Sequence, residues 1–493
     1  MGQFTHADLE IASAYDAYID GERTPPAGGD YSDLIDPASE ESFTRVASCT
    51  EADIDDAVRA ARRAFAEWRE TPPDERGRRI YEMGRVIREH VDELAALESL
   101  DQGKPLSQAQ SDVESAACYF EYYAGFTDKL EGKSIPLGSD TLDFTIREPY
   151  GVSAQITPWN FPGNLFARGT APALVGGNAV VVKPAPNTPL STLRLAELCA
   201  EVGVPDGLIN VVPGGGETGA ALTGHEDVDT ITFTGSVPTG QAIMRSAAES
   251  ITPVTLELGG KNPAIVFPDA DLEAATETIS TAIFTNAGQV CSAADRALVH
   301  ESVYDEFVER IVDLAEEYDL APGAEDADMG PLASEDQFEK VTSYVDLGQR
   351  EGATLAAGGG TPDRPGYYVE PTVFADVEPG MRIEQEEIFG PVLCVVPFAD
   401  EAEALAIAND VEYGLVSGVF TRDVSRAGRL ARRLEAGNVY VNDWFVDTQQ
   451  TPFGGYKRSG IGREKGLEAL ESYVQTKNVA IALEDGGGNL PGA

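Results

Sequence analysis

The spacing of apolar residues changes along this chain, and each change predicts a different kind of secondary structure. Up to about residue 130, apolar residues recur every three or four positions, which indicates helices. One helix begins at Thr50-Glu-Ala-Asp53, a sequence of capping-box type with aspartate in fourth place. A second follows Pro73 and carries its apolar face on to Leu94, and a third spans Leu106 to Leu130. The first residues, to about position 25, are polar and predict an extended lead-in.

Beyond residue 130 the pattern becomes that of strands. Alternating residues between Gly132 and Pro149 predict an excursion of one or two strands. From Val152 onward, short apolar strands alternate with helices, and this alternation restarts after Cys291. We therefore expect parallel sheets covered on both faces, in two α/β units with a ligand crevice between them. The predicted strands are Val152–Ile156, Val180–Val182, Leu208–Val212, Thr230–Phe233, Ala264–Phe267, Ala297–His300 and Val392–Val396, and the predicted helices are Pro189–Val202, Gly240–Ala248 and Val303–Tyr318.

Length and composition limit the class of protein. A chain of 493 residues should form two or three domains, and 42% hydrophobic residues suit a globular protein. No apolar run is long enough for a membrane span, and no secretory signal is visible at the N-terminus, so we expect a cytoplasmic protein. The five cysteines and four histidines fall singly, without disulfide or zinc spacing. No metal site is expected.

The net charge limits the possible partners and surroundings of the protein more than any other feature of its composition. The chain has 83 acidic and 36 basic residues, a net charge of -47. Such a chain repels nucleic acid and anionic membranes, so neither is expected as a partner. The acids are spread along the chain, a distribution typical of halophiles in which molar salt screens self-repulsion. Regular apolar periodicity argues against a disordered acidic protein.

Cys291 differs from the other cysteines in its neighbours. It ends the run Phe284-Thr-Asn-Ala-Gly-Gln-Val-Cys291, and the three residues after it are small. Because the thiolate is the nucleophilic form, a reactive cysteine needs a partly open, polar pocket, and these neighbours leave room for one. Judged on this stretch alone, a small packed hydrophobic residue is the more common interpretation.

Two other stretches offer groups that could assist such a nucleophile. Glu257, in Leu-Glu-Leu-Gly-Gly-Lys, would be partly desolvated, which raises the pKa of a carboxyl toward that of a useful base. Asn160 lies between Pro158 and Pro162, and an amide held rigidly could donate a hydrogen bond to a developing oxyanion. The structural alternatives are a surface glutamate in a turn and a rigid loop without a catalytic role.

Strand ends carry possible phosphate-binding groups. Phe233-Thr-Gly-Ser236 closes a strand and opens a helix, where free backbone N–H groups favour a phosphate. Pro213-Gly-Gly-Gly216 closes the preceding strand with bare backbone. Lys183 follows another strand and could reach an adenosine ribose. Each alone has an ordinary interpretation, the glycine clusters as tight turns and the lysine as a solvated side chain.

Taken together, these stretches resemble the aldehyde dehydrogenase superfamily. The order and spacing match from about Tyr18 to Lys477, nearly the whole chain. Each motif alone is weak to moderate, and the resemblance rests on seven in sequence. The motifs are Pro158-Trp-Asn-Phe-Pro162, Lys183-Pro-Ala185, Phe233-Thr-Gly-Ser236, Glu257-Leu-Gly-Gly-Lys-Asn262, Gly288-Gln-Val-Cys291, Glu387-Ile-Phe-Gly-Pro391 and Pro452-Phe-Gly-Gly-Tyr-Lys457.

The resemblance implies an α/β fold of three parts and an oligomer. Residues 1–130 and 150–257 would form a nucleotide-binding domain with a variant Rossmann sheet. Residues 258–461 would form an α/β catalytic domain. Residues 131–149 and 462–493 would form a small β oligomerisation arm with the C-terminal tail. Members of the family are generally homodimers or homotetramers.

The resemblance also assigns roles to single residues. Cys291 would attack the aldehyde, and Asn160 with the backbone N–H of Cys291 would hold the oxyanion. Hydride would then pass to NAD or NADP, leaving a thioester, and Glu257 would activate the water that hydrolyses it. Lys183 would bind the adenosine ribose, Ser236 the pyrophosphate and Glu387 the nicotinamide ribose. The residues implied at the cofactor site are Ile156, Trp159, Lys183, Gly216, Phe233, Gly235, Ser236, Leu258, Glu387 and Phe389.

One departure from the family pattern concerns the cofactor. Many NAD-preferring members carry a glutamate three residues after the lysine, where it accepts hydrogen bonds from the adenosine ribose. Here that position is Pro186. Nothing at that position repels a 2′-phosphate, so the sequence is compatible with either NAD or NADP as the cofactor.

Arg168 bears on the substrate. It lies eight residues after Asn160, so roughly two helical turns carry it past the oxyanion site. This position lines the substrate entrance in the family and is arginine in succinic semialdehyde dehydrogenases. A guanidinium can hold a carboxylate in a two-pronged pair, which favours an aldehyde with a distal carboxylate. A second arginine of those enzymes is Thr285 here, and Arg168 could instead pair with an acid of this very acidic protein.

Three alternatives remain open at this point. A coenzyme A-acylating semialdehyde dehydrogenase is disfavoured by Glu257, which favours hydrolysis to the free acid. A non-enzymatic binding or structural relative would be expected to lose Cys291, Glu257 or Asn160. A cysteine hydrolase that uses no nicotinamide leaves Phe233-Thr-Gly-Ser236 and Glu387 without a purpose.

Overall fold

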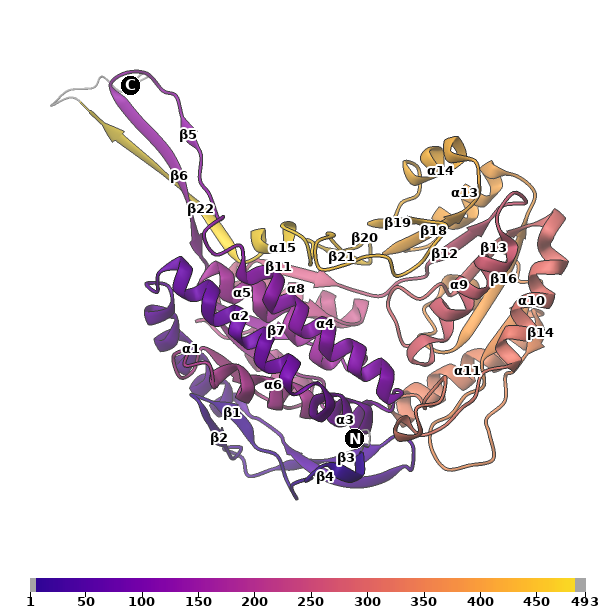
Figure 1. The fold of residues 1–493 in the computed structure, drawn as a ribbon, viewed down its shortest axis with the longest axis horizontal. Helices are drawn as coiled ribbons and strands as arrows, with labels where there is room; N and C mark the ends of the chain where they lie inside the picture. The colour runs from indigo at the N-terminus through magenta and orange to yellow at the C-terminus, as the bar shows by residue number, and fades with distance from the viewer. Residues whose placement is uncertain (1–5, 484–493) are drawn as a thin grey trace.

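The computed structural model describes residues 6–483 and contains two α/β units, each built on its own sheet (Figure 1). Each unit has a separate hydrophobic core. The first core gathers residues between Ala17 and Leu258 together with a few near Tyr473, and the second gathers residues between Ala264 and Phe453. The predicted fold class is confirmed.

The first unit is built on an eight-stranded sheet. Its five inner strands, β9-β8-β7-β10-β11, pair in parallel, and β1, β2 and β21 add antiparallel strands at the edges. Parallel strands buried on both faces often read as short continuous apolar runs, which is the pattern of β8, whereas β7 and β10 alternate apolar with polar residues. The strands in spatial order are β2 (Glu22–Thr24), β1 (Ala17–Ile19), β9 (Ile209–Val211), β8 (Ala179–Lys183), β7 (Val152–Ile156), β10 (Thr230–Thr234), β11 (Val254–Glu257) and β21 (Gly460–Ile461).

Helices cover both faces of this sheet. One layer consists of α2 to α6, in which α4 packs against α2 and α5, and α5 rests on the strands. The opposite layer consists of α1, α7 and α8. The helices are α1 (Glu51–Trp68), α2 (Pro73–Glu89), α3 (Val91–Gln102), α4 (Leu106–Ala124), α5 (Pro162–Gly176), α6 (Leu190–Ala200), α7 (Gly216–Thr223) and α8 (Val237–Ser250).

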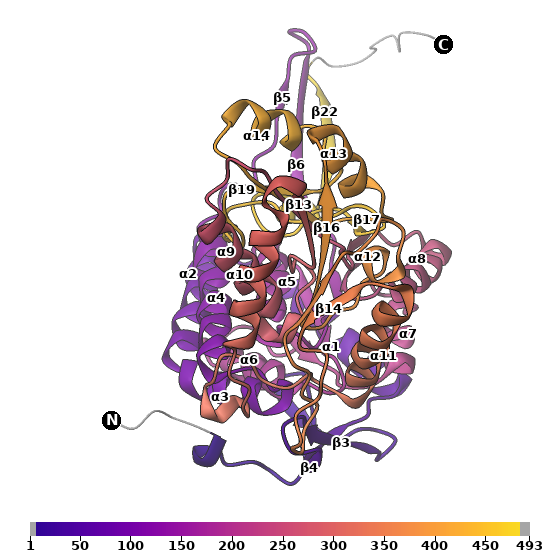
Figure 2. The ribbon, with the colours of Figure 1, turned by 90° about the vertical axis from the view of Figure 1, so that its right-hand side faces the viewer.

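The second unit is built on a seven-stranded, mostly parallel sheet. Figure 2 shows α9 and α10 on one side of its strands and α11 on the other. The strands in spatial order are β14 (Thr354–Ala357), β15 (Thr372–Ala375), β16 (Val392–Phe398), β13 (Arg296–His300), β12 (Pro263–Val266), β18 (Val416–Phe420) and β19 (Asn438–Val441). Its helical segments are α9 (Leu272–Phe284), η2 (Thr285–Gly288), η3 (Glu301–Val303), α10 (Tyr304–Glu316), η4 (Gly323–Glu325), α11 (Glu335–Glu351), α12 (Arg382–Gln385), α13 (Glu401–Asn409) and α14 (Val424–Ala431). The last helix of the chain, α15 (Glu468–Glu471), packs against α5 of the first unit.

A three-stranded arm projects from the body of the molecule (Figure 1). Its strands are β5 (Ser134–Ile135), β6 (Thr141–Pro149) and β22 (Val474–Ala482). β22 pairs antiparallel with β6 along its whole length, with Gln475 opposite Glu148. The arm thus joins two segments that lie far apart in the sequence. A separate hairpin, β3 (Tyr31–Asp36) and β4 (Glu41–Ala47), lies near the N-terminus.

Most predicted elements are present, and two helix bounds within the first 130 residues are wrong. The predicted extended lead-in contributes strands β1 and β2 to the first sheet, because Tyr18 pairs with Val211 at its edge. The second predicted helix ends at Glu89, since His90 has a non-helical backbone and a new helix begins after it. The third ends at Ala124, before Gly125, rather than at Leu130.

The predicted capping box is confirmed, because the Asp53 carboxylate accepts a hydrogen bond from Thr50 N at 2.7 Å. The predicted domain boundaries stay a prediction. One observation bears on them, since β21 lies in the stretch assigned to the second domain but pairs with β11 of the first sheet. The C-terminal tail after Leu483 lies outside the described residues. Among residues 6–483, no helix combines the length and the apolar character needed to cross a membrane.

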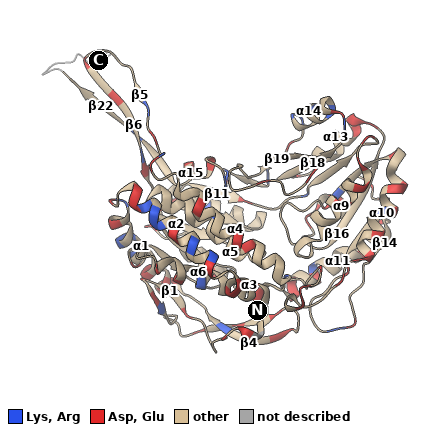
Figure 3. Cartoon of the chain, in the orientation of Figure 1, with Lys and Arg blue, Asp and Glu red and all other residues tan. Residues whose placement is uncertain are grey.

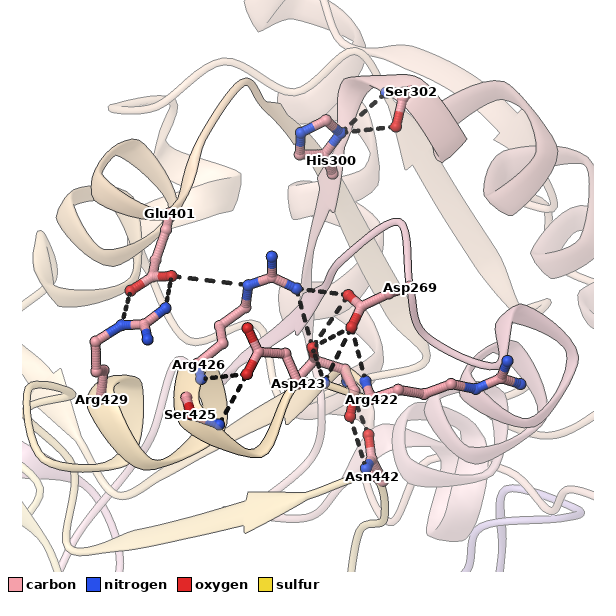
Figure 4. Close-up of polar contacts among 11 residues, drawn as sticks. Asp269, His300, Ser302, Glu401, Arg422, Asp423, Ser425, Arg426, Arg429 and Asn442 are labelled. Atoms are coloured by element: carbon pink, nitrogen blue, oxygen red, sulfur yellow. Dashed lines mark hydrogen bonds and ion pairs between the residues drawn. The ribbon is translucent and has the colours of Figure 1, made fainter.

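Acidic residues are spread over both units and the arm (Figure 3). Where basic residues occur, many join acids in ion pairs on the surface. Figure 4 shows one such group, which follows the carboxyl ends of β12 and β18 in the second sheet. It is called the surface network below and comprises Asp269, Glu401, Arg426 and Arg429.

Candidate active site

A cavity of about 630 Å³ is lined by residues of both units. The first unit contributes the loop after β7 and the ends of β10 and β11, and the second contributes the segment after η2. Carboxyl ends of parallel strands are the usual place for a ligand in such sheets. The three residues predicted to act in catalysis, Asn160, Glu257 and Cys291, all line this cavity.

Cys291 follows a backbone stretch of unusual conformation. Within η2, Asn286 and Ala287 have φ angles of 51° and 53°. Gly288 continues at φ 70°, and a Cβ there would lie 2.0 Å from the carbonyl oxygen of Gly390, so only glycine fits. Three successive left-handed residues turn the chain sharply and bring the thiol of Cys291 to the cavity.

The Cys291 side chain is half-buried at the wall of the cavity. Burial raises its pKa to about 12, although the guanidinium of Arg168 acts in the opposite direction. The thiol therefore holds its proton at neutral pH, and a base has to take that proton when the sulfur attacks.

Glu257 ends β11 and is 2% exposed. Neither carboxylate oxygen has a hydrogen-bond partner among the described residues. Burial, followed by the charge of Glu464, raises the pKa of this carboxyl well above its usual range. A Cβ on Gly454 would lie 2.7 Å from Glu257 Oε1, so the glycine gives the carboxyl its room. The predicted desolvation is confirmed, and the predicted role stays a prediction.

Asn160 lies on the loop between β7 and α5 and is 4% exposed. Its Nδ2 donates to the carbonyl oxygen of Gln289 at 2.9 Å, which ties the amide to the segment that leads into Cys291. Its own carbonyl oxygen accepts hydrogen bonds from Lys104 Nζ at 2.8 Å and from Asn286 Nδ2 at 3.0 Å. The amide and the thiol are thus held in one rigid arrangement.

The predicted cofactor residues fall into two groups. Six of them line the cavity itself: Trp159, Gly235, Ser236, Leu258, Glu387 and Phe389. The other four, Ile156, Lys183, Gly216 and Phe233, do not line it and lie at neighbouring strand and helix ends.

Lys183 ends β8 and is buried, which corrects the interpretation of it as a solvated side chain. It is 6% exposed, its Nζ donates to the carbonyl oxygen of Pro184 at 2.9 Å, and burial lowers its pKa to about 8. A Cβ on Gly219 of α7 would lie 3.5 Å from Lys183 Cδ and 3.9 Å from Ile156 Cδ1, so these side chains are neighbours. Pro186, after the next turn, is exposed.

The backbone near Lys183 leaves space for a nucleotide. Ser236 is the N-cap of α8, and no side chain caps the first turn of that helix. A Cβ on Gly215 or Gly216 would meet no atom within 4 Å. Free N–H groups at a helix start, open glycine backbone and a buried amine fit the phosphates and ribose of a dinucleotide.

Glu387 lies on the other side of the cavity. Its Oε1 accepts a hydrogen bond from Gly260 N at 2.9 Å. A Cβ on Gly259 would lie 2.3 Å from Glu387 Oε2, so the Gly-Gly pair after Glu257 makes room for this carboxylate. Phe389, at φ 62°, packs edge-on against Trp159 with ring centroids 5.3 Å apart.

Several cavity residues were missed from the sequence, and two of them lie on α11. Gln337 and Lys340 of α11 both line the cavity, and Gln337 Nε2 donates to the carbonyl oxygen of Phe389 at 2.6 Å. Burial lowers the pKa of Lys340, while Glu387 acts in the opposite direction. Their spacing of three places them on one helix face, a signal too common in helices to single them out.

Arg168 lines the cavity, but its charge is engaged. It lies on α5, and its Nε is 2.5 Å from Glu464 Oε2 in a buried ion pair. Its Nη2 is 4.0 Å from Glu257 Oε2, and its guanidinium stacks 4.6 Å from the ring centroid of Phe453. Of the two interpretations of Arg168, the contact supports pairing with an acid of the protein, and binding of a substrate carboxylate stays a prediction.

Comparison with protein families gives one match over most of the chain. The family described as the aldehyde dehydrogenase family matches residues 24–479. An aldehyde dehydrogenase of Emericella nidulans is 44% identical over 472 residues, which cover 95% of each chain. A hydroxyisobutyraldehyde dehydrogenase of Mycolicibacterium austroafricanum is 43% identical over 483 residues, which cover 97% of this chain and 96% of that one.

Solved structures are similar to this chain at about the same level of sequence identity as these relatives. An aldehyde dehydrogenase of Bacillus cereus in complex with NAD+ superposes with a TM-score of 0.94 at 44% identity, covering 96% of this chain and 97% of the other. A betaine aldehyde dehydrogenase of Staphylococcus aureus in complex with NAD+ superposes with a TM-score of 0.96 at 41% identity, covering 100% of this chain and 99% of the other.

Proposed function

The chain belongs to the aldehyde dehydrogenase family and oxidises an aldehyde to the carboxylic acid with an NAD-type cofactor, and from this premise we propose that Cys291, Glu257 and Asn160 perform the chemistry. The observation that carries the proposal is the single cavity in which a thiol, a buried carboxyl and a fixed amide meet. The nicotinamide, when bound, accepts the hydride that leaves the reacting carbon.

In this proposal Cys291 attacks the aldehyde carbon and forms a thiohemiacetal. The Asn160 amide and the backbone N–H of Cys291 hold the oxygen as it becomes negative. Loss of hydride converts the thiohemiacetal into a thioester on the same sulfur. Glu257 then takes a proton from water, which attacks the thioester and releases the acid. Its raised pKa makes the ionised carboxylate a stronger base for this step.

The experiment that tests the proposal separates the two halves of the reaction. Glu257→Gln should give a burst of reduced cofactor of about one per active site and then stall, because the thioester forms but is hydrolysed about 10²–10⁴-fold more slowly. Stopped-flow absorbance of the reduced cofactor in molar salt measures both phases, with the unsubstituted protein as control. Absence of any burst would place Glu257 before hydride loss, as the base that takes the Cys291 proton.

For the cofactor, we propose that NADP is accepted as well as NAD. The support is Pro186, an exposed side chain without charge near the buried amine of Lys183. A carboxylate there would repel a 2′-phosphate, and proline does not. Measuring kcat/KM for a panel of aldehydes with each cofactor tests this, and activity with NAD alone would contradict it. The same panel, run without coenzyme A, should release free acid, which distinguishes hydrolysis from coenzyme A acylation.

We also propose that the protein forms a homodimer or homotetramer through the arm. The support is the arm itself, whose strand β22 is almost wholly exposed, with Leu142 at 45% and Ile481 at 44% exposure on its sheet. A projecting sheet with apolar side chains on its surface fits a place between subunits. Light scattering in molar salt measures the mass, and a monomer would contradict the proposal. A cytoplasmic location stays a prediction.

A further inference from the structure

Beneath the loop that carries Asn160 lies a group of charges that the chemistry above does not use. It comprises Glu98, Lys104 and Asp112 and is called the Lys104 cluster below. The Lys104 side chain is 0% exposed. Its Nζ lies 3.1 Å from Glu98 Oε1, 2.6 Å from Asp112 Oδ2 and 2.8 Å from the carbonyl oxygen of Asn160. An ammonium has three N–H donors, and each has an acceptor here.

Lys104 keeps its charge in this dry place. Burial alone would lower the pKa of Lys104, but the charges of Asp112 and Glu98 outweigh burial and raise it. A charged donor makes a shorter and stronger hydrogen bond than a neutral one. The contact to the Asn160 carbonyl is therefore a strong one, and it acts on the main chain of the residue proposed to hold the oxyanion.

The cluster also holds the residues that follow Asn160 in the loop. The Lys104 ammonium lies 4.3 Å from the ring centroid of Phe161. Glu98 Oε2 accepts a hydrogen bond from Gly163 N at 3.0 Å, and a Cβ on Gly163 would come within 2.9 Å of the same oxygen. One buried lysine and its carboxylate partner thus fix three points on four consecutive residues. Asp112, the third member, lines the cavity.

We propose that Lys104 is a positioning residue for aldehyde oxidation, which holds the carbonyl of Asn160 so that the amide of the same residue stays directed at the reacting oxygen. The inference rests on the proposed role of Asn160 and Cys291. The amide and the carbonyl belong to one residue, so a rotation of the main chain displaces the donor. Oxyanion donors act only when they are fixed in place before charge develops.

The first test is Lys104→Met, which keeps the length of the side chain and removes its donors. The rate of the first burst of reduced cofactor should fall by about 10–100-fold, less than removal of an oxyanion donor itself. KM for the aldehyde and the dissociation constant of NAD should change by no more than about threefold. The variant loses stabilisation of the transition state, and the binding of neither ligand depends on that stabilisation. Equal losses in rate, KM and cofactor affinity would assign Lys104 to general structure and overturn the proposal.

Ser191→Ala is the matched control. Ser191 Oγ donates at 3.3 Å to Glu98 Oε2, the oxygen that also accepts from Gly163 N, whereas the contact to the Asn160 carbonyl comes from Lys104. This variant also removes a buried hydrogen bond from the cluster, but it should leave the burst rate within about twofold of the unsubstituted protein. A loss as large as that of Lys104→Met would show that any disturbance of the cluster slows the reaction, and would overturn the specific role of Lys104.

A double-mutant cycle with Asn160→Ala makes the sharper test. That variant keeps the carbonyl that Lys104 contacts but has no amide to direct. If Lys104 acts through Asn160, adding Lys104→Met to Asn160→Ala should lower the burst rate by less than about twofold. Multiplicative losses would mean that the two residues act independently and would overturn the proposal.

If Lys104→Met does not fold, Asp112→Asn provides a second test of the role of Lys104. It retains the lysine but removes one of the two carboxylates around it. The burst rate should fall by about 3–10-fold when Asn160 is present. In the Asn160→Ala background it should fall by less than about twofold. The same loss in both backgrounds would overturn the proposal. Absence of any burst in the unsubstituted protein would contradict the proposed function instead.

Discussion

The Lys104 cluster and the surface network use the same chemical groups in opposite surroundings. The Lys104 and Glu98 side chains are 0% exposed, and Asp112 is 15% exposed. In the surface network, Arg426 lies 2.5 Å from Asp269 in a pair whose side chains are 24% and 37% exposed (Figure 4). Both groups are geometrically good ion pairs, so the difference between them is the solvent.

That difference determines what each group can do. Interactions between exposed charges are weak in water and are screened further by salt. Buried charges are screened little, so a missing partner leaves a charge that costs several kcal/mol. We therefore expect the buried charges to control the chemistry and the exposed charges to control the response to salt. The following predictions test this division, from the largest expected effect to the smallest.

Removing salt should have the largest effect. A chain with a net charge of -47 repels itself, and this repulsion is screened when the Debye length falls to about 3 Å near 1 M salt. At about 10 mM salt the length is roughly 30 Å, and we expect the fold to be lost. Circular dichroism and thermal melts in KCl between these limits measure the effect. Full stability at the lowest salt would show that the exposed acids are not limiting.

The Cys291→Ala variant should lose turnover by at least about 10⁴-fold, because no thiohemiacetal can form. Binding of NAD should be unchanged, and fluorescence titration of the cofactor serves as the control. In the unsubstituted protein, iodoacetamide should modify Cys291 faster as pH rises throughout the range 7 to 10. Desolvation raises the pKa of this half-buried thiol to about 12, so its reactive thiolate fraction still increases there. A plateau below pH 9 would contradict this.

The Arg168→Leu variant should lower stability by about 3–5 kcal/mol, because it leaves the buried Glu464 without its partner. Adding Glu464→Leu should restore much of this loss. On folded protein, kcat/KM should fall equally for succinic semialdehyde and for an uncharged aldehyde of similar length. A loss of about 1.5–3 kcal/mol on the charged substrate alone would show that Arg168 binds a carboxylate.

The Arg426→Met variant should have the smallest effect. The side chain bridges Asp269 and Glu401 in the surface network, and partly exposed pairs contribute at most about 1 kcal/mol. The difference in unfolding free energy from the unsubstituted protein should be measurable in low salt and should shrink in 1 M KCl. A loss that is independent of salt would mean that packing of Arg426 over Phe267, 4.3 Å from the ring centroid, matters more than its charge.

The sequence predicted the fold well where one rule acted alone. Strand β7 begins and ends at the predicted residues, because its apolar residues alternate over five positions between Gly151 and Pro158, two residues that interrupt regular structure. The break at His90 was missed because apolar spacing continues across it from Ile87 to Leu94. Strands β1 and β2 were missed because their three residues are too few to show a period.

The residues of the candidate site likewise divide into those that the sequence could identify and those that it could not. Cys291, Glu257 and Asn160 could be identified because each lies in a motif with a characteristic local sequence. Lys104 and Glu464 could not, because their importance comes from partners far away in the chain. Lys104 meets Asn160 at a separation of 56 residues, and nothing around it in the sequence indicates burial. A lysine next to glycine and proline is ordinarily a solvated side chain in a turn.

The order in which the chain is made has a consequence for how it can fold. Arg147 of β6 and Thr476 of β22 are neighbours in the arm but lie 329 residues apart in the sequence. In the same way β11 receives its partner β21 only from the last part of the chain. During synthesis, both strands therefore leave the ribosome with an open edge long before their partners exist. Open strand edges invite pairing with other nascent chains, and contacts of such long range form slowly. Because molar salt screens charge beyond about 3 Å, the acids of neighbouring chains oppose such pairing only at close contact, so the acidic surface protects the unfinished protein only where two open edges meet directly.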